Sequence, residues 1–394
     1  MNSILLHLCL LLVSFVNRAS AILVACPELE ECNCNETSIH CHSSSPLETT
    51  RLDQTFFSEL PDFIQDTTTH LTVSGGNITE LFKNSFGKCA GDSSKSHPLL
   101  KSIVLRHNNI QKIHGQAFHC VPNVQYLDLS QNNWTVSNLN HTAIFSGIPN
   151  LKTLMLTDSM KDHYSGKRHM RRLSAVFNNS HLSALEEIYL GKNDLWTFTS
   201  DATSTLCQVT KSLRILDLHS NNLGTLVFDP CFGNLTKLQL INLRDNSFIK
   251  VSLNSIRMFD QLYKNNNRFT VDFRGNQWDC DCHLVEFTKW LRNTDVNIRG
   301  KQNMTCHDGQ NLGKNLWDIP NSDLVCVAMA SAQVANPGVI VVGILLAIIG
   351  CVVVGIAIMK RDAIKSAYLG LKKSYFAKDV QFSYASVNNS NVDV

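Results

Sequence analysis

The feature that most constrains the fold is a short pattern of leucines that recurs along most of the chain. Its clearest copy is residues 213–223, LRILDLHSNNL, with leucine at the first, fourth, sixth and last positions and asparagine at the ninth. The same frame begins at residues 68, 100, 124, 151, 185, 213, 238 and 268, so successive copies start 24 to 34 residues apart. A helical protein with leucines at chance spacing would not repeat one frame this often, so the chain is built from repeated units.

This spacing is the signature of leucine-rich repeats. The fourth and sixth side chains of each copy share one face of a short strand and point inward. The asparagine can pair backbone groups where the chain leaves the strand, since a buried unpaired group costs about 1–3 kcal/mol. One unit cannot cover its own apolar edge, so the units must stack. We predict an α/β leucine-rich repeat solenoid, a horseshoe with a parallel sheet on its concave side.

The repeats are predicted to occupy residues 67–268, with an insertion near 159–182 that interrupts the frame. Gly76 and Ser159 stand in the asparagine place of their copies. The insertion is a candidate site for a sulfated glycan or an acidic partner, and a solvated surface loop is the alternative. Against Asp162 it carries five basic residues: Lys161, Lys167, Arg168, Arg171 and Arg172.

Composition narrows the class of protein. The 394 residues suffice for several domains, and 35 Lys+Arg nearly cancel 33 Asp+Glu, so a nucleic-acid partner is not indicated. Of 14 cysteines, Cys9 and Cys351 lie in hydrophobic segments, which leaves an even set of twelve. Paired cysteines and glycosylation sequons together indicate a secretory, oxidising compartment.

The first 66 residues have the pattern of a signal peptide followed by a small cap. An apolar run from Ile4 to Val16 precedes the small residues Ala19-Ser20-Ala21, which predicts a signal peptide at 1–21. Residues 22–66 match the amino-terminal cap that flanks extracellular leucine-rich repeats. That match implies the bridges Cys26–Cys34 and Cys32–Cys41, with a zinc site at Cys-x-Cys as the alternative.

Two further disulfides follow from the repeat frame. Cys89 and Cys120 lie 21 and 20 residues after the starts of their copies, and Cys207 and Cys231 lie 22 and 18 residues after theirs. Stacking brings similar offsets side by side on the convex surface. We therefore predict the bridges Cys89–Cys120 and Cys207–Cys231.

Residues 269–327 are predicted to form a carboxyl-terminal cap that covers the last open edge of the sheet. The segment Asp279-Cys280-Asp281-Cys282 closes the last strand, and Cys306 and Cys326 follow, which predicts the bridges Cys280–Cys306 and Cys282–Cys326. Between them, four apolar residues at helical spacing predict one helix: Leu284, Phe287, Trp290 and Leu291.

After a stalk at 328–337, residues 338–359 are uncharged and mainly apolar, and Lys360 and Arg361 follow at once. As a helix, this segment would span about 33 Å, enough for a hydrocarbon core of about 30 Å. Positive charge after it places that side in the cytoplasm. These features predict a single-pass type I plasma-membrane protein. A small-residue ridge that would permit a homodimer runs through the span at Gly343, Ala347, Cys351 and Gly355.

Residues 360–394 are predicted to be a short, disordered cytoplasmic tail. Tyr368 and Tyr384 each begin a Tyr-x-x-apolar sorting pattern. The last four residues fit the β-strand addition by which PDZ domains bind chain ends, with Val392 and Val394 as anchors.

Two sets of residues describe the predicted outer surface. Asparagines that head Asn-x-Ser/Thr sequons are expected glycosylation sites: Asn35, Asn77, Asn133, Asn140, Asn178, Asn234 and Asn303. Apolar residues at outward strand positions, which the core does not need, are expected to contact a partner: Tyr126, Met155, Tyr189, Ile215 and Leu240. Shielding of these five by neighbouring side chains or glycans is the alternative.

One known family shares the interrupted middle repeat and five segments of this chain: 279–283, 288–291, 321–326, 345–350 and 389–394. From the amino-terminal cap to the last residue, the chain therefore resembles the trophoblast glycoprotein (Wnt-activated inhibitory factor) family. It departs at Ser159 and at His40, where a basic side chain is expected before the cap cysteine. The resemblance implies a plasma-membrane glycoprotein that inhibits Wnt/β-catenin signalling through surface trafficking of the Wnt co-receptor, with ties to adhesion.

Neither a catalytic constellation nor a metal or cofactor site shares one face of the repeats, so an enzyme is not expected. Solenoids of this kind bind other proteins. The leading hypothesis is an antagonist of Wnt signalling acting on an extracellular or membrane protein. The rival is a cell-adhesion or synapse-organising receptor that uses the concave sheet and the PDZ ligand of the tail.

Overall fold

The structure is a computed structural model in which the chain divides into two compact units, Met1–Cys326 and Val327–Val394. The predicted signal peptide, most of the insertion, the stalk and most of the tail lie outside the described residues. The structure describes residues 24–26, 29–45, 49–87, 89, 96–135, 144–160, 174, 177, 180–308, 310–326, 337–363 and 365–372.

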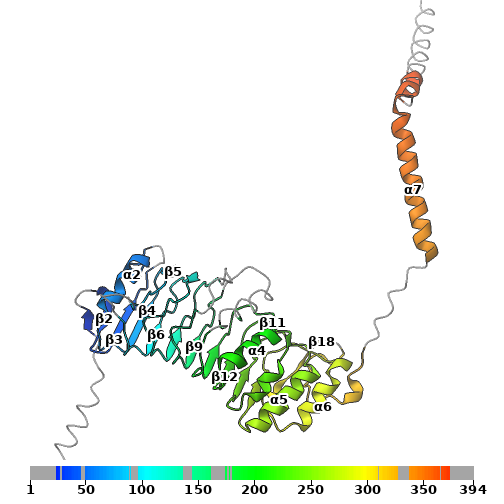
Figure 1. Ribbon diagram of the computed structural model, residues 1–394. Helices are drawn as coiled ribbons and strands as arrows, with labels where there is room; N and C mark the ends of the chain where they lie inside the picture. Colours follow the sequence, from blue (N-terminus) through cyan, green and yellow to red (C-terminus); the bar gives the residue numbers. More distant parts are fainter. Residues whose placement is uncertain are drawn as a thin grey trace, which may run out of the picture. The chain divides into compact units, whose positions relative to one another are not determined.

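The first unit is organised around one 12-stranded sheet, whose strands lie side by side along the solenoid (Figure 1). The first two pairs, β1–β2 and β2–β3, are antiparallel, and every later pair is parallel. In order across the sheet the strands are β1 (Val24–Cys26), β2 (Leu29–Cys34), β3 (Ser38–His42), β4 (His70–Ser74), β6 (Ser102–Val104), β8 (Tyr126–Asp128), β9 (Thr153–Met155), β10 (Glu187–Tyr189), β12 (Ile215–Asp217), β14 (Leu240–Asn242), β15 (Thr270–Asp272) and β17 (Asn297–Arg299).

The repeat strands of the 12-stranded sheet from β6 to β15 are each three residues long. The central residue of each of these three-residue strands is the fourth residue of its repeat, and it pairs with its equivalent in the next repeat. Complete burial of a leucine or isoleucine side chain stabilises the fold by about 1.5–3 kcal/mol. The central residues with no exposed surface include Ile103, Leu127, Leu154, Ile188, Leu216 and Ile241.

Buried asparagine side chains link each repeat to the one before it. The Asn221 Oδ1 accepts the backbone N–H groups of Asn193 (2.8 Å) and Leu195 (3.1 Å). Its Nδ2 donates to the carbonyls of Leu190 (3.0 Å) and Leu218 (2.9 Å). The equivalent bonds of Asn132, Asn193, Asn246 and Asn276 follow the same scheme. The proposed role of the ninth position is therefore visible in the hydrogen bonds.

The two exceptions at the ninth position have separate physical reasons. A Cβ on Gly76 would come within 2.9 Å of the Asn108 Oδ1 and closer still to the Leu52 carbonyl oxygen, so a side chain does not fit. The Ser159 Oγ donates to the Leu156 carbonyl at 2.8 Å but makes no bond back to the preceding repeat among the described residues. The side-chain ladder is thus interrupted where the insertion begins.

Phenylalanine rings fill the space behind the sheet. In the first repeats, consecutive ring centroids lie 5.5–6.3 Å apart along Phe57, Phe86, Phe118, Phe145 and Phe177. A second cluster gathers around Phe259, which contacts Phe228, Phe269, Phe273 and Trp290. Such pairs stabilise the core by about 0.5–1.5 kcal/mol each beyond their buried area.

Outside the 12-stranded sheet, the described part of the first compact unit contains helices, two-stranded sheets and 3-10 turns. Asp53, Thr199 and Ser252 cap three of the helices, each accepting the backbone N–H three residues later. The α-helices are α2 (Gln54–Phe63), α4 (Ser200–Val209), α5 (Leu253–Asn265) and α6 (Val285–Asn293). The two-stranded sheets are β5–β7 (Glu80–Leu81, Lys112–Ile113), β11–β13 (Thr197–Phe198, Thr225–Leu226) and β16–β18 (Trp278–Asp279, Cys306–Asp308). Single 3-10 turns are η1 (Pro230–Asn234), η2 (Cys282–Leu284), η3 (Lys301–Asn303) and η4 (Asn321–Asp323).

Disulfide-bonded caps cover both ends of the sheet. At the first end, β1 to β3 continue the repeat sheet, so the cap and the first repeat share backbone hydrogen bonds. At the other end, β17 adds a strand beyond β15. The structure joins the cysteines in the six pairs predicted from the sequence: Cys26–Cys34, Cys32–Cys41, Cys89–Cys120, Cys207–Cys231, Cys280–Cys306 and Cys282–Cys326.

The second unit contains one long helix, α7 (Pro337–Met359), which coincides with the apolar segment 338–359. The structure describes side chains of α7 only for residues 345–356 and 358. Within the described part of the chain, no helix is both long enough and apolar enough to cross a bilayer.

The asparagine ladder yields a stability prediction. Replacing Asn221 with leucine removes the acceptor for two buried N–H groups and the donor to two buried carbonyls. We expect Asn221→Leu to lower the free energy of unfolding by about 2–4 kcal/mol, measured by chemical denaturation. The exposed neighbour supplies the control, since Asn222→Ala should change it by less than about 0.5 kcal/mol. Equal losses in both variants would argue against the ladder.

Candidate binding surface

The open face of the sheet is the candidate site, and it consists of three rows of outward side chains. We define it as the third, fifth and seventh residues of each repeat, which alternate with the buried fourth and sixth residues. In register from β4 to β15, the third-position row is His70, Ser102, Tyr126, Thr153, Glu187, Ile215, Leu240 and Thr270. The fifth-position row is Thr72, Val104, Asp128, Met155, Tyr189, Asp217, Asn242 and Asp272.

The five predicted contact residues all lie on this face and are all half-buried. Met155 is directly opposite Tyr189 on the neighbouring strand, and Ile215 is directly opposite Leu240. Tyr126 lies apart from these four residues, because its neighbour on β9 is Thr153. The structure thus brings four of the five together as two adjacent pairs and places the fifth on the far side of β9.

Charged pairs surround these apolar residues, and sequence reasoning overlooked them. The Asp217 carboxylate lies 2.6 Å from the His219 Nδ1 and accepts a 3.0 Å hydrogen bond from Asn242 on the next strand. Two repeats further on, Asp272 lies 2.6 Å from a terminal nitrogen of Arg274. In both cases an acid at the fifth position pairs with a base at the seventh, a spacing that the repeat frame already contained.

The Asp217–His219 pair shifts both of its groups. Burial acts to raise the pKa of Asp217, but the hydrogen bonds from His219 outweigh it and leave that pKa lowered. The hydrogen bond from Asp217 raises the pKa of His219 against an opposing effect of burial. The imidazole lies over Gly191, where any Cβ would collide with the ring. The pair is therefore held in place by the repeat before it.

A second group gathers around Glu187. The Tyr189 hydroxyl donates to the Glu187 Oε2 at 3.1 Å, and the Arg214 guanidinium lies 3.9 Å from its Oε1. Burial and then Glu187 raise the pKa of Tyr189 to about 12. Burial, Asp128 and Glu187 raise the pKa of Tyr126, against a smaller opposing effect of Arg106. Both phenols therefore stay neutral at physiological pH and act as hydrogen-bonding, aromatic walls.

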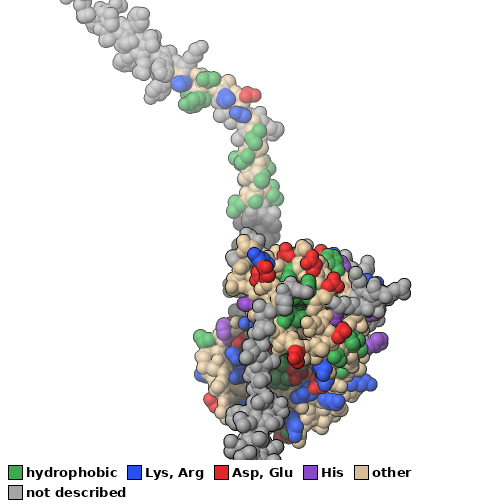
Figure 2. Space-filling model, turned by 90° about the vertical axis from the view of Figure 1, so that its left-hand side faces the viewer, with side chains coloured by type: hydrophobic (Ala, Val, Ile, Leu, Met, Phe, Trp, Pro, Cys, Tyr) green, Lys and Arg blue, Asp and Glu red, His purple; other side chains and the backbone are tan. Residues whose placement is uncertain are grey.

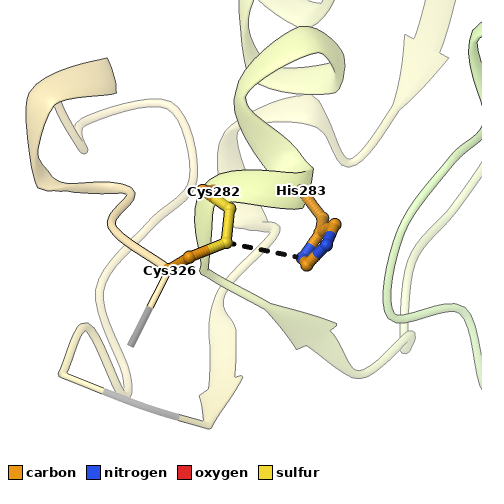
Figure 3. Close-up of side chains that lie close together, drawn as sticks. All are labelled: Cys282, His283 and Cys326. Atoms are coloured by element: carbon orange, nitrogen blue, oxygen red, sulfur yellow. Dashed lines mark hydrogen bonds between the residues drawn. A yellow bond between two sulfur atoms is a disulfide. The ribbon is translucent and has the colours of Figure 1, made fainter. Parts of the chain in front are cut away.

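The carboxyl-terminal cap brings together Cys282, His283 and Cys326, a set of residue types that binds metals elsewhere (Figure 3). The two sulfurs are joined in a disulfide, and the His283 Nδ1 lies 3.9 Å from the Cys326 Sγ. Cysteine binds a metal as the thiolate, so with both sulfurs in a disulfide the cluster offers only the imidazole. His283 instead pairs with Asp281 at 2.8 Å. We therefore interpret the disulfide and the His283–Asp281 pair as contacts that stabilise the carboxyl-terminal cap.

The described sequon asparagines differ in their placement. Asn234 and Asn303 are exposed, whereas Asn35, Asn77 and Asn133 are half-buried. The Asn77 Oδ1 accepts a 2.9 Å hydrogen bond from Asn109 in the next repeat. Asn140 and Asn178 lie outside the described residues. Attachment of glycans remains a prediction at all seven.

Charge elsewhere on the first unit is mixed. Figure 2 shows acidic, basic and histidine side chains together on the end of the solenoid that it presents. Of the tail residues, Tyr368 is exposed on the helical stretch after α7. Tyr384, Val392 and Val394 lie outside the described residues, as do the five basic residues of the insertion.

Comparison with known proteins agrees with this architecture. Models of the leucine rich repeat match residues 67–134, 98–158 and 212–235. The chain is 25% identical over 352 residues to trophoblast glycoprotein from Macaca fascicularis, covering 86% of this chain and 76% of that protein. It is 27% identical over 358 residues to trophoblast glycoprotein from Mus musculus, covering 86% and 77%.

Among solved structures, human Wnt-activated inhibitory factor 1 (trophoblast glycoprotein) has a similar fold. The TM-score is 0.59 at 21% sequence identity, and the match covers 78% of this chain and 100% of that one. The predicted resemblance to trophoblast glycoproteins is thereby confirmed, and the leucine-rich repeat fold with it.

The Asp217–His219 pair yields a prediction on pH dependence. Because the pKa of His219 is raised in the folded state, the pair contributes stability that is fully present below the unfolded pKa of about 6.5. This contribution is lost as pH rises through the folded pKa. The lowered Asp217 pKa contributes above about 3.9 and is lost on acidification. The pair should therefore stabilise the fold most between about pH 4 and pH 6.5.

We expect His219→Gln to remove this dependence. Because the pair is partly exposed, the difference in unfolding free energy between pH 6 and pH 8.5 should be below about 1 kcal/mol in the wild type. It should be smaller still in the variant. Denaturation at both pH values measures it, with His119→Gln, at an exposed position, as the control. This account would be contradicted if the wild type gained no more stability than His219→Gln when the pH is lowered from 8.5 to 6.

Proposed function

We propose that the chain is a cell-surface leucine-rich repeat glycoprotein that inhibits Wnt/β-catenin signalling by altering surface trafficking of the Wnt co-receptor. The observation that carries the proposal is the similarity to trophoblast glycoproteins along 86% of the chain. A relative with the same fold bears the name Wnt-activated inhibitory factor 1. That name describes the relative, and the proposal extends its activity to this chain.

The open face of the sheet is the surface proposed to bind a protein partner. The pairs Met155–Tyr189 and Ile215–Leu240 are half-exposed in the middle of the sheet. Apolar and aromatic side chains at the centre of a surface ringed by charge resemble the anchors of protein interfaces. Stacked repeats provide the extended surface that such a partner needs.

The proposal places residues 338–359 across the membrane and the repeats outside the cell. The support for this comes from the sequence, in which the 22 uncharged, mainly apolar residues 338–359 would span about 33 Å as a helix, compared with about 30 Å of hydrocarbon. Its described apolar side chains, Leu346 and Ile358 among them, are exposed, as Figure 2 shows for the hydrophobic residues of this unit. Lys360 and Arg361 follow on the proposed cytoplasmic side.

Two partners on the membrane and cytoplasmic sides belong to the same proposal. The small residues Gly343, Ala347, Cys351 and Gly355 would let two copies approach as a homodimer. The tail ending at Val394 would bind a PDZ domain. An adhesion or synapse-organising receptor is the rival, and it uses the same open face in trans.

Expression in Wnt-treated cells tests the leading function. We expect the full chain to lower a β-catenin reporter and to reduce the surface-biotinylated Wnt co-receptor. A reporter driven by constitutively active β-catenin, downstream of the receptors, should not respond. An unchanged reporter together with aggregation of the expressing cells would favour the adhesion receptor.

A substitution on the open face tests where the partner binds. Introducing charge through Ile215→Glu and Leu240→Glu should disrupt an apolar contact surface, and we expect at least a tenfold weaker effect on the reporter. Leu312→Glu, at an exposed position of the carboxyl-terminal cap, is the matched control and should keep full activity. Surface expression of both variants must equal that of the wild type. Full activity of the open-face variant would place the contact elsewhere.

A further inference from the structure

We propose that the disulfide between Cys282 and Cys326 is a site of thiol–disulfide exchange, at which a dithiol reduces this bridge selectively while the repeats stay folded. The bridge lies in the carboxyl-terminal cap, and Cys326 is the last residue of the first compact unit. The imidazole of His283 assists the exchange from beside the two sulfurs (Figure 3). Selective reduction here is independent of the proposed effect on Wnt signalling.

Exposure to solvent distinguishes this bridge from the other five. Cys326 is an exposed residue, and Cys282 is half-buried. Of the other bridges, four contain at least one buried cysteine, and the fifth, Cys207–Cys231, is half-buried at both ends. A thiol must reach a sulfur in order to attack it, and exposed disulfides are the labile ones. The Cys282–Cys326 bridge is therefore the one that a reductant in solution meets first.

A histidine beside the sulfurs is the second observation. The two sulfurs and a ring nitrogen of His283 all lie within 4.8 Å of one another, and the Nδ1 is 3.9 Å from the Cys326 Sγ. The Asp281 carboxylate fixes the ring, because it accepts hydrogen bonds from the backbone N–H and the Nδ1 of His283, each at 2.8 Å. A neighbouring imidazolium stabilises a thiolate, and a stabilised thiolate leaves a disulfide faster.

The exchange consists of two steps. A thiolate of the dithiol attacks the Cys326 Sγ, the bond to the Cys282 Sγ breaks, and Cys282 leaves as a thiolate that the imidazolium stabilises. The second thiol of the dithiol then loses its proton, attacks the dithiol's own sulfur in the mixed disulfide and releases the Cys326 thiolate. Both cysteine thiolates take up protons. The bridge has then gained two electrons and two protons, and the dithiol has become a disulfide.

Contacts other than this disulfide hold the end of the cap. The Asn321 Oδ1 accepts a 2.8 Å hydrogen bond from the Arg292 guanidinium. The Asp323 carbonyl accepts one from the Asn311 side chain at 3.0 Å, and Leu324 is buried. Because none of these contacts involves the sulfurs, the cap keeps its fold as far as Leu324 when the bridge opens.

Beyond Leu324 the disulfide is the main attachment to the cap. Val325 is exposed, and within the described part of the chain neither Val325 nor Cys326 takes part in a backbone hydrogen bond. Reduction therefore frees these two residues, which add about 7 Å of extended chain between the cap and the segment that follows it. The exchange thus changes how the folded repeats are attached to the rest of the chain.

The other bridge of the cap has the features of a purely structural disulfide. Both Cys280 and Cys306 are buried, and Cys306 lies in β18, where it is in register with Trp278 of β16. This bridge is enclosed by the fold that it stabilises. The cap therefore contains one protected disulfide and one open to exchange.

Quantitative thiol labelling of the full chain in detergent micelles tests the site. Dithiothreitol is added under native conditions, N-ethylmaleimide stops the reaction at intervals, and the remaining bridges are then reduced and labelled with isotopically heavy N-ethylmaleimide. Peptide mass spectrometry gives the rate of reduction for each cysteine. We expect Cys282 and Cys326 to be reduced together, at least tenfold faster than the half-buried pair Cys207 and Cys231.

Two substitutions separate the charge of His283 from its shape. His283→Gln has a similar size without the positive charge and should slow the reduction at least threefold. His283→Lys restores a cation and should recover at least half of the wild-type rate. The matched control is His307→Gln, because His307 is exposed and follows Cys306 as His283 follows Cys282, and it should leave the rate unchanged. Thermal unfolding must show that each variant is folded.

The chain reduced at this bridge alone should keep the circular dichroism spectrum of the oxidised chain. Reduction of all the bridges at one rate would show that the chain must unfold before it reacts, and would overturn the proposal. So would reduction of Cys282–Cys326 no faster than that of Cys207–Cys231, loss of the spectrum when only this bridge is reduced, or equal rates for the wild type and His283→Gln.

Discussion

The structure depends on the buried asparagine amide at the ninth position of most repeats. Its oxygen accepts N–H groups of the previous unit, and its nitrogen donates to carbonyls of both units, as at Asn221. These bonds fix the distance and rotation between neighbouring strands, because the buried groups have no solvent to replace a lost partner. The open face is regular for this reason: its third, fifth and seventh residues fall into rows only when each repeat is held in register with the next.

The caps cover the two ends of the sheet, which the repeats cannot cover by themselves. An uncovered end of the sheet would expose both its hydrogen-bonding edge and the apolar core behind it. The antiparallel strands β1 and β2 and the added strand β17 cover those edges, and the disulfides Cys32–Cys41 and Cys280–Cys306 hold them there. The repeats are thereby free to present one long surface, which is the property that the proposed binding function uses.

Electrostatics on the open face follow a local rule with one exception. Acids at the fifth position pair with bases two residues later, as in Asp217–His219 and Asp272–Arg274. Such pairs leave little net charge and add modest stability. Asp128 is the exception, because the residue two positions later is Ser130. The regularity of the repeats is what makes the exception visible.

The sequence by itself determined the repeat frame, the inward leucines and the ninth-position asparagines, because these follow from periodicity within one unit. It also predicted the pairs Cys89–Cys120 and Cys207–Cys231, since similar offsets in stacked units lie side by side, whereas the cap pairs were inferred from the cap patterns. Only the tertiary structure decided which outward residues meet. Tyr126 and Glu187 are 61 positions apart in the chain and lie in register with the same residue, Thr153, on the strand between them. Because the repeats differ in length, separation in the sequence does not show which outward residues become neighbours. The hydrogen bonds between adjacent strands set that register.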